Sequence, residues 1–370
     1  MRLRLRLLAP LVVCALLAGC AHATDDKPRP AEEMGTPTGV RASVTIDPDS
    51  TPTTVVSGLA APWSMVRLES GSTLISERDT RLVKELTSGG QLREVGTIAD
   101  AAPGGEGGLL GLATLDGTAL YAYLTTTTDN RIVRFDLDGE PGAYSLGASR
   151  DILTGLQKSR VHNGGRIAFG PDGMLYATVG DASEPASAQD LNSLNGKILR
   201  MTPDGSVPAD NPIAGSLIYS LGHRNPQGLA WDADGQLWAA EFGQDTWDEL
   251  NIIHAGSNYG WPIVEGDSAD TRFEPPAYQW ATDDASPSGL TYVQGTFFMA
   301  GLGGERLWEI HPDDATTAPE AAFAGTFGRI RDVTPGPDGS LWVLTNNTDG
   351  RGEPRENDDR ILQVTLVPAG

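Results

Sequence analysis

The sequence predicts an all-β fold, specifically a six-bladed β-propeller of four-stranded antiparallel blades. A glycine-containing turn, often Asp-Gly, precedes an apolar strand, and this pattern recurs six times after residue 54. Six units over about 320 residues give roughly 50 residues per unit, which suits a propeller blade. No long segment repeats apolar residues at the helical period, which disfavours a helical bundle.

The repeated unit has a second apolar stretch after the first. The turn and its strand occupy residues 70–75, 116–121, 171–176, 233–238, 294–298 and 337–342, of which 294–298 is the loosest copy. The second stretch occupies residues 81–86, 131–135, 197–201, 248–253, 306–310 and 360–364. Polar and apolar residues alternate in these stretches, as they do in antiparallel strands. A two-sheet sandwich is the alternative fold, but it seldom reaches this size.

The first 20 residues have the features of a lipoprotein signal peptide. Three arginines precede an apolar run at residues 7–17, which is too short to span a bilayer. The run ends in Leu-Ala-Gly-Cys at residues 17–20, which resembles the lipobox of bacterial lipoproteins, with Cys20 as the lipidated residue. We therefore expect an exported protein, lipid-anchored to the membrane at the cell surface or in the periplasm. A plain secretory signal with a chance cysteine is the alternative.

The expected domain organisation follows from composition. Residues 21–52 are rich in Pro, Asp, Glu, Thr and Lys and are predicted to form a flexible tether, and residues 53–370 are predicted to form the propeller. The net charge of −22 argues against a nucleic-acid partner, because phosphate neutralisation requires clustered Lys and Arg. The only other cysteine, Cys14, lies in the signal, so the mature chain is expected to have no disulfide.

A candidate catalytic pair lies in residues 161–181. If residues 167–169 and 174–179 form a hairpin across Gly-Pro-Asp-Gly, His162 and Asp181 lie at the same end of it. A general base and its orienting carboxylate require that arrangement. The alternative interpretation is an ordinary turn histidine and a strand-end cap.

Two further loops carry arginines. Residues 221–229 place Arg224 and Asn225 in one polar loop, which is either part of a site or a surface loop with a salt bridge. Arg329 and Arg331 lie two residues apart, on one face of an extended segment. Such a pair suits a ligand with carboxylates or phosphates, unless acidic side chains of the protein itself neutralise it.

An acidic turn suggests calcium. Residues 241–249 contain four carboxylates and a glycine, and residues 258–262 follow with a tyrosine. Calcium takes six to eight oxygen ligands, although this spacing is not that of an EF-hand. A solvated acidic loop is the alternative. The sequence contains no nucleophile elbow, phosphate-binding loop, His-Glu-x-x-His motif or cysteine pair that would indicate other chemistry.

Six spaced motifs occur together in one order. They are His-Asn-Gly-Gly-Arg at 162–166, Leu-Asn-Gly-Lys-Ile-Leu-Arg at 194–200 with Asp-Gly at 204 and Asp-Asn-Pro at 210, His-Arg-Asn-Pro-Gln-Gly at 223–228, Asp-Glu-Leu-Asn at 248–251, Asn-Tyr-Gly-Trp-Pro at 258–262, and Arg-Ile-Arg-Asp-Val at 329–333. Because these motifs occur together, the chain from about residue 54 to 366 resembles the soluble pyrroloquinoline quinone (PQQ)-dependent glucose and aldose sugar dehydrogenases.

The resemblance implies PQQ- and calcium-dependent oxidation of the C1 hydroxyl of aldoses to lactones, with electrons passing to a quinone or another acceptor. His162 would be the general base and Asp181 its orienting carboxylate. The positions implied for the cofactor are Glu106, Arg224, Asn225, Arg329 and Arg331. Those implied for calcium are the carbonyls of Gly243 and Gln244, together with Asp248, Glu249 and Tyr259.

The chain departs from the family pattern near the expected cofactor. Glu106 stands where a glutamine is expected, and its carboxylate would repel an anionic cofactor unless it is protonated or bound to a cation. Gly303 stands where a lysine is expected, and Gln244 replaces a proline. A calcium-dependent lactonase on a similar propeller and a non-catalytic binding propeller are the alternative functions.

Overall fold

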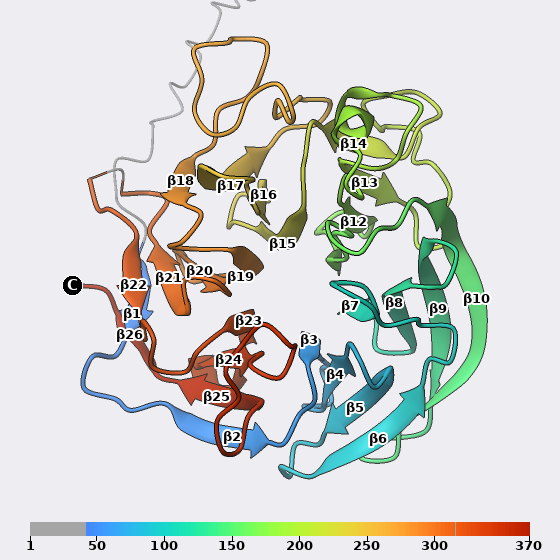
Figure 1. The fold of residues 1–370 in the computed structure, drawn as a ribbon. Coiled ribbons are helices and arrows are strands. Elements are labelled where there is room, and N and C mark those ends of the chain that lie inside the picture. Colours follow the sequence, from blue (N-terminus) through green and yellow to red (C-terminus); the bar gives the residue numbers. More distant parts are fainter. Residues whose placement is uncertain (1–41, 315) are drawn as a thin grey trace, which may run out of the picture. The chain divides into compact units, whose positions relative to one another are not determined.

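Six four-stranded antiparallel sheets form a ring in the computed structural model (Figure 1). The structure describes residues 42–314 and 316–370. These lie in the second of the two units into which the chain divides, residues 1–39 and 40–370. The predicted fold class is confirmed.

The strands of the first five sheets follow in chain order. The first blade contains β3 (Pro62–Arg67), β4 (Thr73–Glu77), β5 (Leu82–Leu86) and β6 (Leu92–Thr97), and the second contains β7 (Leu109–Ala113), β8 (Ala119–Thr125), β9 (Asn130–Asp138) and β10 (Ser145–Leu156). The third contains β11 (Ile167–Phe169), β12 (Leu175–Val179), β13 (Lys197–Met201) and β14 (Ile218–Leu221), and the fourth contains β15 (Pro226–Trp231), β16 (Leu237–Glu241), β17 (Trp247–Ile253) and β18 (Tyr278–Ala281). The fifth contains β19 (Pro287–Val293), β20 (Thr296–Gly301), β21 (Arg306–Ile310) and β22 (Glu320–Ala322). The sixth sheet combines β23 (Ile330–Pro335), β24 (Leu341–Thr345) and β25 (Arg360–Val364) with β2 (Thr53–Ser57) from near the start of the described chain. The helical elements of the described chain are two short 3-10 helices, η1 (Pro185–Gln189) and η2 (Pro337–Gly339).

The repeated turns and strands lie where the sequence predicts them. Each turn joins the first two strands of a blade, and the second apolar stretch forms the third strand. The fourth strand of each blade was not recognised from the sequence. It is the outer edge of its sheet, and in β10 and β22 most residues are at least partly exposed, so the apolar signal is weak.

The ring is closed by the two ends of the domain. β2 pairs with β25, which places an early segment in the last blade. A separate two-stranded sheet pairs β1 (Val44–Ile46) with β26 (Leu366–Pro368). β1 falls within the stretch predicted to be a tether, so that part of the stretch is a strand. Residues 1–41, which include the predicted signal peptide and Cys20, lie outside the described residues, and no helix in the described part is long and apolar enough to cross a bilayer.

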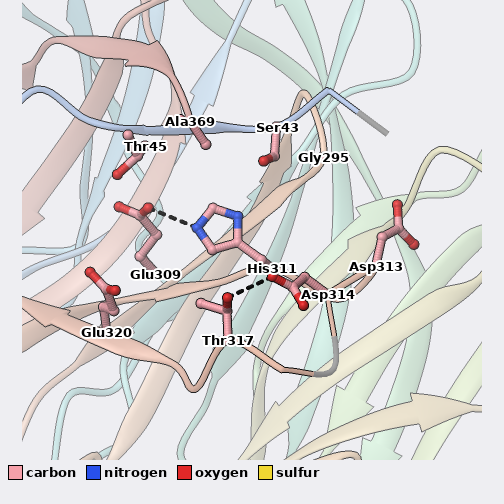
Figure 2. Close-up of a pocket in the computed structure, with 11 residues that line it drawn as sticks. Ser43, Thr45, Gly295, Glu309, His311, Asp313, Asp314, Thr317, Glu320 and Ala369 are labelled. Atoms are coloured by element: carbon pink, nitrogen blue, oxygen red, sulfur yellow. Dashed lines mark hydrogen bonds and ion pairs between the residues drawn. The ribbon is translucent and has the colours of Figure 1, made fainter. Parts of the chain in front are cut away.

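A hydrogen-bonded cluster attaches β1 to the fifth blade. His311 Nε2 lies 3.0 Å from Glu309 Oε1 (Figure 2), and Glu309 Oε2 accepts the backbone N–H of Ile46 at 3.1 Å. Thr296 Oγ1 donates to the carbonyl of Val44 at 2.6 Å. A cavity beside this cluster is lined by Glu309, His311, Asp313, Asp314 and Glu320, and Glu309 is the member of this set that is hydrogen-bonded to β1.

The topology brings particular loops to one end of the ring. Strands β3, β7, β11, β15, β19 and β23 are the first of their blades. Neighbouring first strands pack together around the centre, except that β15 contacts β12 of the preceding blade. In an antiparallel blade, the loop after the second strand and the loop between blades leave from the same end. The Asp-Gly turns leave from the opposite end. The loops at the end opposite to the Asp-Gly turns contain His162, Asp181, Arg224, Gly243 and Arg329.

Candidate active site

His162 and Asp181 form a hydrogen-bonded pair. His162 Nδ1 lies 2.8 Å from Asp181 Oδ1, and the Asp181 side chain is completely buried. Gly180 permits this approach, because a Cβ at that position would lie 2.1 Å from the carbonyl oxygen of His162. The predicted juxtaposition of the two side chains is confirmed, and His162 lies in the loop before β11, ahead of the predicted hairpin.

Asp181 accepts two further hydrogen bonds. The backbone N–H of Ser183 donates to Oδ1 at 2.8 Å, and the indole N–H of Trp261 donates to Oδ2 at 2.9 Å. Because donors surround the carboxylate, we assign His162 Nδ1 as a third donor. In the neutral ring, Nε2 then carries the lone pair that can accept a proton.

A cavity beside this pair is lined by an excess of positive charge. Its charged lining consists of Arg78, Arg329, Arg331, Arg351, Glu106 and Asp349. It encloses about 440 Å³ with its open mouth included. Four guanidinium groups thus face two carboxylates in a protein whose net charge is −22. Asp79, outside the lining, accepts two hydrogen bonds from Arg78 at 2.7 and 2.9 Å, so the local excess is one positive charge. Such a local excess favours an anionic ligand.

The predicted arginine pair shares one acid. Arg329 Nη2 lies 3.2 Å from Asp349 Oδ2, and Arg331 Nη2 lies 3.8 Å from the same oxygen. Burial lowers the pKa of Arg331, which Asp349 opposes, and the neighbouring Arg329 lowers it further. Asp349 therefore neutralises part of the charge of Arg329 and Arg331, as expected from the alternative in which acidic side chains of the protein neutralise the pair. One carboxylate between two guanidinium groups still leaves positive charge uncompensated.

The loop before β15 contacts the surroundings of the His162–Asp181 pair, since the backbone N–H of Asp181 donates to the carbonyl of Arg224 at 2.8 Å. The guanidinium of Arg224 lies over the ring of Trp261, with 5.5 Å between the guanidinium carbon and the ring centroid. Asn225 Oδ1 accepts the backbone N–H of Gly164 at 3.0 Å, so its side chain supports the histidine loop. The Nε atoms of Arg224 and Arg329 are buried and have no hydrogen-bond partner within the described part of the chain.

Glu106 already has two partners. Its Oε2 accepts the backbone N–H of His162 at 2.8 Å, and its Oε1 lies 3.0 Å from Arg351 Nη1. The cation that the sequence analysis required for this carboxylate is therefore Arg351. Gly303 lies against Ser286, since a Cβ there would be 2.4 Å from Ser286 Oγ.

The acidic loop after β16 is organised around Glu265. Its Oε1 accepts the backbone N–H groups of residues 244, 245, 246 and 247 at 2.7 to 3.1 Å. In a trans peptide the C=O points opposite to the N–H. The carbonyls of Gly243 and Gln244 therefore point away from Glu265, and neither accepts a hydrogen bond from another described residue. Two free carbonyl oxygens on one side of a loop are suitable ligands for a hard cation.

The other residues predicted to bind metal are Asp248, Glu249 and Tyr259. Burial raises the pKa of Asp248 to about 6, although backbone N–H groups of Gly243 and Ser286 oppose the shift. Burial and the charge of Glu241 raise the pKa of Glu249 to about 7. The hydroxyl of Tyr259 donates to the carbonyl of Ile252 at 2.6 Å. Across residues 42–314 and 316–370, no group of three or more His, Cys, Asp or Glu side chains is arranged to hold a metal ion, so any calcium here needs backbone ligands.

Several residues around the site were not predicted from the sequence. They are Arg78, Trp261, Glu265, Asp349 and Arg351. A topological signal was available for three of them, because Arg78, Asp349 and Arg351 lie in loops between the second and third strands of a blade, as Asp181 does. The other two lie in the long loop between β17 and β18 and are brought to the site only by its folding.

The fold and the site define a class of protein, a six-bladed propeller with a histidine–aspartate pair beside an arginine-lined cavity at one end of the ring. The family model described as glucose / sorbosone dehydrogenase matches residues 59–356. The chain belongs to this family.

Several named proteins are similar to this chain. The PQQ-bound aldose sugar dehydrogenase of Streptomyces coelicolor superposes with a TM-score of 0.83 at 46% identity, covering 89% of this chain and 99% of that structure. Quinoprotein glucose dehydrogenase B of Acinetobacter calcoaceticus is 37% identical over 39% of this chain and 36% of its own length. Aldose sugar dehydrogenase of Escherichia coli is 33% identical over 51% of this chain and 58% of its own length.

Proposed function

We propose that the protein oxidises the C1 hydroxyl of aldose sugars to lactones, using PQQ and calcium. The observation that carries the proposal is a histidine–aspartate pair beside a cavity in which arginines outnumber carboxylates. The PQQ-bound relative supports the choice of cofactor. The sugar class follows the names of the relatives.

The residues present fit PQQ. The cofactor carries three carboxylates, and the unpartnered Nε atoms of Arg224 and Arg329 are donors that need an acceptor. Arg329 and Arg331 would hold carboxylates, since a planar guanidinium can bind such a group through two parallel hydrogen bonds. When bound, the quinone supplies the acceptor for the hydride that leaves C1 of the sugar.

His162 supplies the base. Its Nε2 takes the proton of the C1 hydroxyl, and the ring then carries a positive charge. Asp181 stabilises that imidazolium through Nδ1–H, while Trp261 and Ser183 hold the carboxylate in place. Burial of Asp181 strengthens this electrostatic interaction, because water does not screen it.

The carbonyls of Gly243 and Gln244 would hold calcium. The metal would act there as a Lewis acid toward the quinone. Asp248 and Glu249 lie in the neighbouring β17, and a cation would favour their ionised forms. Glu265 contributes indirectly, by orienting both carbonyls.

Replacing Glu265 by alanine is expected to weaken calcium binding about 10- to 100-fold, the range for residues that orient metal ligands. The four N–H groups lose their shared acceptor, so the two carbonyls lose their common orientation. Isothermal titration calorimetry of chelator-treated protein with calcium measures the change. Glu140→Ala is the matched control, since this glutamate is exposed in another turn. Unchanged affinity in Glu265→Ala would mean that this loop does not hold calcium.

Reconstitution tests the function directly. We expect that purified protein incubated with PQQ and calcium will reduce a dye in the presence of an aldose, and that omitting either component will abolish the rate. The absence of a quinone spectrum on the protein and of a rate with every aldose tested would refute the proposal.

We also propose that the chain is exported and lipid-anchored through Cys20. The arginine-led apolar run and the Leu-Ala-Gly-Cys sequence support this localisation. Incorporation of labelled fatty acid in a bacterial host should disappear in Cys20→Ser. Equal labelling of both proteins would contradict the anchor.

A further inference from the structure

We propose that Glu106 is a positioning residue for the base: it holds the main chain of His162 in place, and Arg351 links it to the arginines of the cavity. This inference rests on the proposed function for its kinetic consequence. It assigns to Glu106 a role other than cofactor contact. Glu106 would act through His162, without touching the reacting atoms.

Glu106 forms two hydrogen bonds with the loop between β10 and β11, which carries His162. Its own backbone N–H donates to the carbonyl of Arg160 at 2.7 Å. Its side-chain Oε2 accepts the backbone N–H of His162 at 2.8 Å. The preceding Gly105 makes the close approach possible, because a Cβ there would lie 2.1 Å from the carbonyl oxygen of Arg160. The glycine-rich loop 104–108 therefore serves as a support for the loop that carries the base.

His162 needs such support because its backbone is strained. Its φ of 58° lies in the left-handed region, which residues other than glycine adopt only when their surroundings hold them there. The carbonyl of His162 accepts the N–H of Ala182 at 3.1 Å, and the ring is bonded to Asp181. The contact to Glu106 holds the remaining backbone group, the N–H. Together these contacts define where Nε2 lies.

Arg351 connects this support to the cavity. Its Nη1 lies 3.0 Å from Glu106 Oε1, and its backbone N–H donates to Asp349 Oδ1 at 2.9 Å. The other oxygen of Asp349 faces Arg329 and Arg331. A continuous set of charged contacts therefore runs from the arginine pair to the backbone of the base. It crosses between loops that are about 245 positions apart in the chain.

The ion pair with Arg351 also explains why position 106 carries a carboxylate. A glutamine could accept the N–H of His162, but it could not form an ion pair with Arg351. Because Arg351 is half-exposed at the mouth, the ion pair alone adds little to stability. Its effect is to fix the orientation of the Glu106 side chain. The charge of Glu106 is balanced, so it need not repel an anionic cofactor.

The kinetic test uses two variants of Glu106. Glu106→Ala is expected to lower kcat about 10- to 100-fold, because a misplaced catalytic group costs rate of that order. The affinity for PQQ should change less than about 3-fold if Glu106 acts on the base alone. Glu106→Gln keeps an acceptor for the N–H of His162 and should recover most of kcat. Glu94→Ala, which changes an exposed residue of β6, is the control.

A second readout does not need cofactor or turnover. The imidazole signals of His162 in nuclear magnetic resonance spectra of the apoprotein should shift or broaden in Glu106→Ala. They should shift less in Glu106→Gln and in Arg351→Gln, since both variants keep a side-chain oxygen at position 106 that can accept the His162 N–H. Thermal unfolding of each variant shows whether the fold is intact.

The outcomes separate this inference from the proposed function. If wild-type protein neither binds PQQ nor oxidises aldoses, the proposed function fails, while the spectra of His162 still test the positioning role. Unaltered His162 signals in folded Glu106→Ala would overturn the inference. A large loss of PQQ affinity with unchanged kcat would also overturn it, because Glu106 would then be a cofactor contact.

Discussion

Replacing His162 by alanine is expected to lower kcat about 10²- to 10⁴-fold, the usual contribution of a positioned general base. The substitution removes Nε2, which is the proposed proton acceptor, and leaves Asp181 with its donors from Ser183 and Trp261. PQQ affinity should fall much less, since no part of the arginine set is changed. Dye-reduction kinetics and a quinone titration measure the two effects separately.

A matched control is the exposed His254, which lies after β17. His254→Ala removes an imidazole from a site remote from the base and should keep the wild-type rate. Asp181→Asn should also be slow, because an amide can present its N–H to Nδ1 and reverse the required tautomer. A His162→Ala enzyme with normal kcat would show that another group takes the proton.

Replacing Arg329 by glutamine is expected to weaken PQQ binding about 10- to 100-fold. A hydrogen bond between charged groups contributes about 1.5–3 kcal/mol, and the unpartnered Nε of Arg329 is free to form one. The fold should tolerate the change better than a change at Arg331. Arg331 is buried against Trp63, Gln227 and Ser288, whereas Arg329 is less enclosed.

Arg272→Gln is the matched control, because Arg272 is exposed and pairs with Asp270 on the same loop. Fluorescence quenching or calorimetry with PQQ measures both affinities. If Arg329→Gln binds PQQ as tightly as wild type, the cavity does not hold the cofactor in the proposed way. Hydrolysis of lactones that is insensitive to this substitution would instead favour the lactonase alternative.

The elements that local patterning encodes were predictable. The hairpin of β11 and β12 brings His162 and Asp181 together because two short strands and a tight turn leave little freedom in the intervening chain. The blade count followed from turns at regular spacing, each of which is specified by its own few residues. The arginine pair was visible because its two members are adjacent on one extended segment.

Contacts that depend on ring closure were not predictable. Glu106 meets Arg351, and Asp349 meets Arg329, only because the blades are arranged around one channel. β2 joins the sixth blade from the other end of the domain, and nothing in its five residues specifies β25 as its partner. Glu265 was overlooked because its role lies in accepting four backbone N–H groups, which leave no pattern in the side chains.

The class of fold, the repeated blade and the location of His162 and Asp181 at the same end of one hairpin could be read from the sequence, since periodicity and turn chemistry are local properties of the chain. The balance of charges around the cavity became visible only in the folded ring. There, Arg351 is the cation for Glu106, and one carboxylate serves two arginines. Electrostatic balance depends on distances of a few ångströms between loops far apart in sequence, and the packed ring defines those distances.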